Sequence, residues 1–109
     1  MIKKIALLIL ITVLATGVKM DAQNNVFIQN NTTADVTFAL SVNPNNFNTL
    51  AVGNGSNYSM DSYSQCQIYI PTYNSSGEVV NSVTATINSG LRYQIYWDAN
   101  NQRFDIKPL

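Results

Sequence analysis

Few side chains in this 109-residue chain could carry acid–base or nucleophilic chemistry. Histidine, the usual general base near neutral pH, is absent, and only six residues are acidic. A glycosidase needs two carboxylates facing each other across a cleft, and Asp98 and Asp105 flank one expected hairpin. A capped turn and a solvated strand account for both residues without catalysis. The serines have no histidine or lysine beside them for activation, so we predict that the chain is not an enzyme and has no catalytic residues.

The single cysteine and the missing histidines also limit metal and disulfide chemistry. A structural zinc site takes four Cys or His ligands, which this chain cannot supply. The segment 98–100 begins like a calcium loop, but Arg103 replaces the glycine at the sixth position and no acidic residue follows at the twelfth. A hairpin turn explains this segment better, with an irregular calcium site as the alternative, so we expect no metal and no cofactor. Cys66 is in phase with Ile68 and Ile70, which predicts a buried thiol, with an intermolecular disulfide as the alternative.

Two expected strands carry tyrosine, amide and charged side chains on the face that points away from the core. If both strands lie in one sheet, these side chains form a single surface. Aromatic rings stack on sugars and amides bind hydroxyl groups, whereas Tyr and Arg are also favoured anchors at protein interfaces. An ordinary solvated sheet face uses the same residue types. The predicted ligand-binding residues are Gln67, Tyr69, Tyr73, Arg92, Gln94, Tyr96 and Asp98.

A second candidate surface is expected in the loops 43–48 and 53–58, because binding residues on a rigid sandwich often lie in loops. Phe47 and Tyr58 are the aromatic residues there, and we expect Phe47 to tuck under its own loop. Trp97 is in phase with Tyr93 and Ile95, which predicts a core position. Asn-x-Ser/Thr triplets, which matter only in a host that glycosylates, begin at Asn30, Asn31, Asn54, Asn57 and Asn74.

Period-two alternation of apolar and polar residues predicts the strands that would position these groups. The clearest case is 35–42, where Val36, Phe38 and Leu40 share one face. Turn residues recur roughly every 8–12 positions, as in sandwiches and small barrels. We expect 26–29 to form a hairpin with 35–42, 43–46 to be a loop, and 48–52 to pair with 57–60. The other expected strands are 65–73, 79–87, 91–98 and 103–107.

The fold class predicted from this pattern is all-β. We expect residues 23–109 to form one small antiparallel β-sandwich, Ig-like or similar, of about seven strands. A partly closed barrel is the alternative.

The segment 1–22 is typical of a secretory signal peptide. Lys3 and Lys4 precede an apolar run over 5–15, about half of the roughly 20 residues that span a bilayer as a helix. We favour cleavage after Ala22, with cleavage after Gly17 as the alternative, and expect a secreted protein, extracellular or periplasmic. No cysteine follows the run to carry a bacterial-type lipid anchor, so no membrane anchor is expected after cleavage.

Charge and size narrow the function classes further. Removal of 1–22 leaves 87 residues with three basic and five acidic side chains, a net charge near −2. Nucleic-acid binding needs clustered Lys and Arg, so it is not expected. A domain this small without an internal disulfide is only marginally stable, and a homo-oligomer is one way to compensate.

The opening 26–28, the turn at 31–33 and the strand at 36–38, together with 95–98, resemble the lipid-binding aegerolysin sandwiches. The resemblance covers two strands and implies no site or activity here. We expect a small secreted binding module that recognises an extracellular protein or glycan through the Tyr/Gln-rich face. The alternatives are a structural or self-assembling exported protein and a small secreted effector or toxin acting on membranes.

Overall fold

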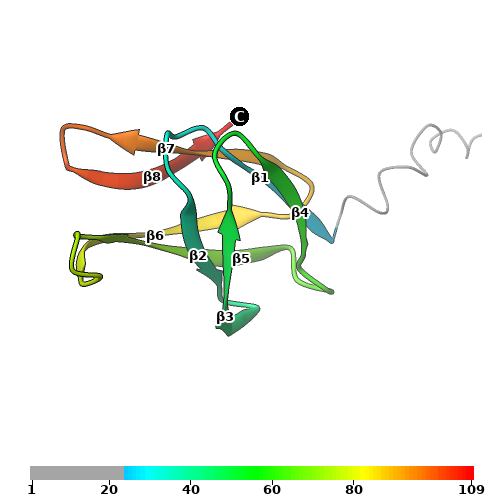
Figure 1. Cartoon of the computed structure of the whole chain (residues 1–109). Coiled ribbons are helices and arrows are strands. Elements are labelled where there is room, and N and C mark those ends of the chain that lie inside the picture. The colour runs from blue at the N-terminus through cyan, green and yellow to red at the C-terminus, as the bar shows by residue number, and fades with distance from the viewer. Residues whose placement is uncertain (1–23) are drawn as a thin grey trace, which may run out of the picture.

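Two facing four-stranded sheets make up the fold in the computed structural model, which describes residues 24–109 (Figure 1). One sheet has the strand order β4-β1-β7-β8 and the other the order β3-β2-β5-β6. Neighbouring strands are antiparallel except β1 and β7, which are parallel. The strands are β1 (Asn25–Asn30), β2 (Val36–Leu40), β3 (Asn43–Leu50), β4 (Gly55–Ser59), β5 (Gln65–Tyr73), β6 (Val79–Asn88), β7 (Arg92–Asp98) and β8 (Arg103–Pro108).

The predicted all-β sandwich is therefore confirmed, with eight strands instead of about seven. Each sheet keeps two edge strands, so the sheets do not close into a barrel. The predicted signal peptide and its cleavage site lie outside the described residues. Within residues 24–109, no helix is long and apolar enough to cross a membrane.

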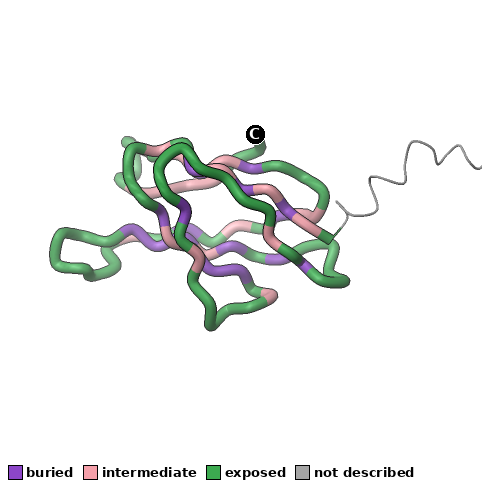
Figure 2. The backbone as a smooth tube through the Cα atoms, turned by 45° about the vertical axis from the view of Figure 1, so that its right-hand side comes forward, coloured by how far each residue is buried: buried purple, intermediate pink, exposed green. Residues whose placement is uncertain are grey.

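The core fills the space between the two sheets and contains alternate residues from most strands (Figure 2). Ile28 and Ile95 enter it from one sheet, and Phe38, Ile68 and Ile87 enter it from the other, all with no exposed surface. This alternation follows from the strand geometry, in which successive side chains point to opposite faces. The inward positions that the sequence pattern predicted for Phe38, Ile68 and Ile95 are therefore confirmed. Cys66 is buried with a free thiol, as predicted.

Asn30 carries the chain from one sheet to the other, which is why the predicted hairpin of 26–29 with 35–42 is wrong. Its fully buried side-chain Nδ2 donates to the carbonyls of Ala34 at 2.8 Å and Leu50 at 3.0 Å. Its Oδ1 accepts hydrogen bonds from the Thr32 amide and hydroxyl. These bonds stabilise the connection between β1 and β2 as an arch, which is a connection that crosses from one sheet to the other. β1 and β2 therefore lie in different sheets.

A second arch crosses between the sheets beside the first. The Asn30 amide donates to the Asn54 carbonyl at 2.8 Å, and the Gly53 amide donates back to the Asn30 carbonyl at 3.0 Å. Gly53 has a φ of 75°, a backbone conformation that favours glycine. β3 and β4 therefore also lie in different sheets, so the predicted pairing of 48–52 with 57–60 is wrong.

Two local expectations also need correction. The predicted loop 43–46 belongs to β3, which pairs with β2 across a register shift at Ala39 and Leu40. Trp97 is 41% exposed and rests edge-to-face on Phe104, with ring centroids 5.1 Å apart. It keeps the inward phase, but it follows the last β7 residue that belongs to the core cluster. Alternation specifies a face, and it does not specify where along a strand the core ends.

Candidate functional site

The seven predicted ligand-binding residues do not form one surface, because their two strands lie in different sheets. The side chains of Gln67, Tyr69 and Tyr73 come from β5, and the other four residues lie on β7. Since both sheets turn their apolar sides to the shared core, their outward side chains point to opposite sides of the sandwich. The expectation of a single Tyr/Gln-rich face is therefore wrong.

The outward side of the β3-β2-β5-β6 sheet, which we call the neutral face, carries no charge. None of its four strands contains Asp, Glu, Lys or Arg. The outward side chains of the neutral face include those of Ala39, Ser41, Phe47, Gln67, Tyr69, Thr84 and Thr86.

A hollow of about 250 Å³ opens on the neutral face. Two of the predicted residues, Gln67 and Tyr69, line it together with Phe47 and Pro44 from β3. Tyr73 does not line it, because a register shift between Thr72 and Tyr73 breaks the regular pairing at the end of β5. The remaining wall comes from Ala39, Leu40, Ser41 and Thr84.

The hollow forms where two hairpins diverge. β2 pairs with β5 through only two residue pairs, Ala39 with Tyr69 and Leu40 with Ile68. Beyond them the β2–β3 hairpin runs steeply across the β5–β6 hairpin (Figure 1). The register shift at Ala39 and Leu40 sits at this junction, and bulges of this kind increase local strand twist. A small residue at position 39 leaves the floor of the hollow open.

Two polar groups at the hollow are available for a ligand. Within residues 24–109, neither the Gln67 side-chain amide nor the Tyr69 hydroxyl has a hydrogen-bond partner. Ser41 is held in place, because its hydroxyl accepts a hydrogen bond from the Gln67 backbone amide at 2.9 Å. The Phe47 ring is 53% exposed beside these groups. The hollow thus combines an apolar wall with a small number of free hydrogen-bonding groups.

The opposite side of the sandwich, the charged face, contains the other four predicted residues. It is formed by the outward side chains of β7 and β8 with Phe27 of β1. Its cations already have partners, since the Arg92 guanidinium lies 4.3 Å from the centroid of the Phe27 ring and Lys107 Nζ lies 4.4 Å from that of Tyr96. Gln94 accepts a hydrogen bond from the Asn31 side chain at 2.7 Å.

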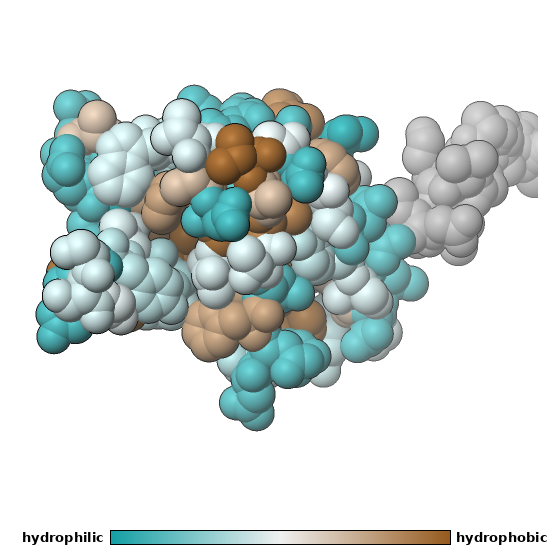
Figure 3. All heavy atoms as spheres, in the orientation of Figure 1, coloured by the Kyte–Doolittle hydropathy of each residue, from teal (hydrophilic) through white to brown (hydrophobic). Residues whose placement is uncertain are grey.

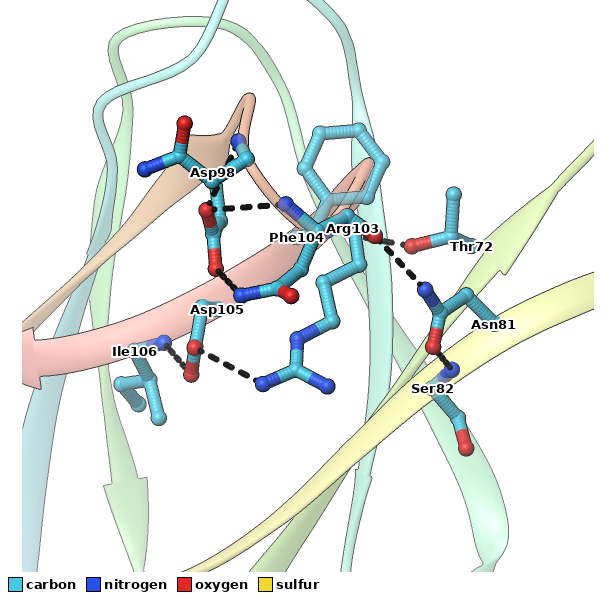
Figure 4. A network of polar contacts seen from close by, with 10 residues as sticks. Thr72, Asn81, Ser82, Asp98, Arg103, Phe104, Asp105 and Ile106 are labelled. Carbon is cyan, nitrogen blue, oxygen red and sulfur yellow. Dashed lines mark hydrogen bonds and ion pairs between the residues drawn. The ribbon is translucent and has the colours of Figure 1, made fainter.

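The two carboxylates of the β7–β8 hairpin, Asp98 and Asp105, contact neighbouring residues of the same hairpin (Figure 4). Asp98 accepts hydrogen bonds from the Asn101 side chain at 2.8 Å and from the amides of Asn100 and Asn101. These bonds, the one from the Asn101 side chain first, lower the pKa of Asp98. Asp105 accepts from the Ile106 amide and lies 3.7 Å from the Arg103 guanidinium. Desolvation and the carboxylates of Asp105 and Asp98 raise the pKa of Tyr96.

The two segments of the second candidate surface do meet, but not as predicted. Asn43, Asn46 and Asn48 line a smaller hollow of about 160 Å³ with Tyr58 and Ser59. The Tyr58 ring packs edge-to-face on Phe38 with centroids 5.2 Å apart, and burial raises its pKa. Phe47 does not tuck under its own loop, because it stands on the neutral face.

The described residues offer little for metal or thiol chemistry. In residues 24–109 no group of three or more His, Cys, Asp or Glu side chains is placed to hold a metal ion. Burial raises the pKa of the Cys66 thiol, which disfavours the reactive thiolate. Among the Asn-x-Ser/Thr triplets, the Asn30 side chain is fully buried and could not be modified in the folded chain.

Comparison of the sequence with protein-family models and with curated proteins found no match in either case. The resemblance to the aegerolysins therefore rests on the residues that carry it. Four residues of the hollow wall lie in neither predicted surface, namely Ala39, Leu40, Ser41 and Thr84, whereas Pro44 and Phe47 belong to the segment 43–48 of the second. Alternation places Ala39 on an outward face, but nothing in the sequence brings β2 and β3 beside Tyr69.

Proposed function

We propose that the chain is a small secreted, non-catalytic binding module that recognises an extracellular protein through the hollow of the neutral face. The observation that carries the proposal is the exposed Phe47 ring beside Tyr69 in an uncharged hollow. Small-molecule and side-chain pockets are typically apolar with a few polar groups that fix orientation. The Gln67 amide and the Tyr69 hydroxyl supply such groups here.

The chemistry of the hollow favours an apolar side chain of a protein partner over a sugar. A sugar presents hydroxyl groups around its ring and needs several directional hydrogen bonds. No charged side chain lines the hollow, and its wall includes Ala39, Leu40, Pro44 and Phe47. An aromatic or aliphatic anchor from a partner would instead gain from desolvation of this wall.

The test is a comparison of one random displayed-peptide library and one glycan array, both probed with the same exported chain. We expect peptides with an apolar anchor to be enriched and to bind Phe47→Ser at least about tenfold more weakly. Tyr96→Ser on the charged face is the matched control and is expected to bind as the parent chain does. Melting curves check that both variants stay folded.

Three outcomes would contradict the proposal. Selective glycan binding without peptide binding would assign the hollow to sugars. Peptide binding that is lost in Tyr96→Ser and kept in Phe47→Ser would move the site to the charged face. Failure to enrich any peptide or glycan would contradict the proposal that this hollow binds a partner.

A further inference from the structure

β6 is the least protected edge of the sandwich. It pairs with β5 alone and forms one border of its sheet. It is ten residues long and contains no Asp, Glu, Lys, Arg or Pro. At its start, Val79 is 50% exposed and Val80 is 60% exposed. A long, uncharged edge strand rich in β-branched residues is a template for pairing with another chain.

The other three edges each carry a feature that discourages such pairing. β8 contains Arg103, Asp105, Lys107 and Pro108. β3 contains Pro44, and the register of its pairing with β2 shifts between Ala39 and Leu40. β4 is only five residues long and begins with Gly55. Charges, proline, bulges and short length are the usual means of blocking an edge, so the contrast with β6 is specific.

We propose that β6 pairs antiparallel with β6 of a second copy of this chain, which joins two β3-β2-β5-β6 sheets into one continuous sheet. In a two-fold pairing residue i of one copy meets residue j of the other and residue j meets residue i, so a charge near the axis would lie close to its own copy. β6 has no charge to oppose itself. Its exposed Thr84 and Thr86 are of the type that pairs favourably across strands.

The pairing uses the C-terminal part of β6, residues 83–87, because the Asn88 amide already donates to the Tyr93 hydroxyl at 3.0 Å. At the other end, the Asn81 side chain donates to the Asn101 carbonyl at 2.9 Å and accepts from the Ser82 amide at 2.8 Å (Figure 4). The β7–β8 turn therefore already occupies that end. Thr86 lies near the centre of the remaining stretch and does not line the hollow of the neutral face.

This inference goes beyond the proposed binding function and adds to it. In an antiparallel pairing the two-fold axis stands perpendicular to the sheet, so both neutral faces point to the same side. A dimer would present two hollows together, and two linked sites can bind a multivalent partner far more tightly than one.

The test is sedimentation velocity of the chain recovered from an exporting host, over a series of increasing concentrations. We expect a concentration-dependent dimer, and Thr86→Lys should raise its dissociation constant about tenfold, because two like charges close together across the paired strands destabilise the pairing. Asn57→Lys on β4 adds the same charge to an exposed position of another edge strand and is expected to dimerise as the parent chain does.

Hydrogen exchange of the backbone amides provides the second measurement. We expect protection of 83–87 to rise with concentration, while protection of β3 and β4 stays constant. A chain that is monomeric at every concentration would overturn the proposal. So would a dimer that Thr86→Lys leaves unchanged, or one that protects another edge. Peptide binding measured on the same variants distinguishes failure of this proposal from failure of the proposed function.

Discussion

The two outward faces of this sandwich are built from similar strands and differ in whether their polar side chains contact one another. On the charged face, Arg92 and Lys107 lie over aromatic rings, and Asp98 holds the turn that follows β7. On the neutral face, the Gln67 amide and the Tyr69 hydroxyl have no partner within residues 24–109. A face whose polar groups satisfy one another stabilises the fold, whereas a face with free groups and a hollow is available to a ligand.

The apolar residues that do reach the surface are distributed unevenly. In the space-filling view, hydrophobic atoms come to the surface at the connection between β3 and β4 (Figure 3). Val52 in that connection is 50% exposed and Phe47 on the neutral face is 53% exposed. Single exposed apolar residues are normal on a surface. Phe47 differs because it stands beside a hollow lined by another aromatic ring.

The largest expected effect follows from removing the side chain of Asn30, which holds the connection between the two sheets. Asn30→Ala deletes hydrogen bonds to one buried and one partly buried carbonyl and should lower the free energy of unfolding by about 3 kcal/mol. Urea denaturation measures the loss. Asn31→Ala is the matched control, because its side chain is exposed and makes one hydrogen bond, to Gln94. Equal stability of both variants would mean that the arches do not depend on Asn30.

The next effect concerns binding and compares the two faces directly. Tyr69→Ala should weaken binding of an apolar peptide by about tenfold or more, because aromatic residues dominate the energy of small interfaces. Tyr96→Ala should leave that affinity unchanged. Isothermal titration with one selected peptide measures both. A larger loss for Tyr96→Ala would reverse the roles of the faces.

A smaller effect is expected from acid and belongs to the charged face. Because the pKa of Asp98 is lowered in the folded chain, its ionised form stabilises the fold above the ordinary aspartate pKa. This contribution is lost as the pH falls through the lowered pKa. Asn101→Ala removes the largest cause of the lowered pKa. The free energy of unfolding of this variant should therefore fall less as the pH is lowered into the acid range. Asn100→Ala keeps the backbone hydrogen bond to Asp98 and should lose stability in acid as the parent chain does. Urea midpoints measured from neutral to acidic pH decide between them.

The smallest effect tests the ring contacts of the charged face. Arg92→Gln removes the cation over Phe27 at an exposed site and should cost about 0.5–1 kcal/mol of unfolding free energy. Thr49→Gln replaces an exposed neutral-face residue and should change stability less. A stability loss for Arg92→Gln that equals that of Asn30→Ala would show that the charged face contributes far more than surface contacts usually do.

The sequence predicted the strands well and their arrangement poorly, for a physical reason. Alternation along 65–73 is a local property, and β5 spans Gln65–Tyr73 as expected. Partner choice depends on contacts between distant segments, and the buried Asn30 looks like an ordinary turn residue in the sequence. The outward positions of Gln67 and Tyr69 could be predicted because they depend only on alternation along β5. Phe47 was misplaced because its position depends on how β3 crosses β5.

The position of β1 inside its sheet also has a consequence for how the chain reaches this fold. β1 lies between β4 and β7, and its parallel neighbour β7 is close to the other end of the chain. During synthesis β1 emerges well before β7, with five other strands between them in the sequence. Val26 and Ile28 cannot be fully buried until β7 is in place, and parallel pairing across so long a connection is slow to form. Completion of this sheet is therefore a late step of folding.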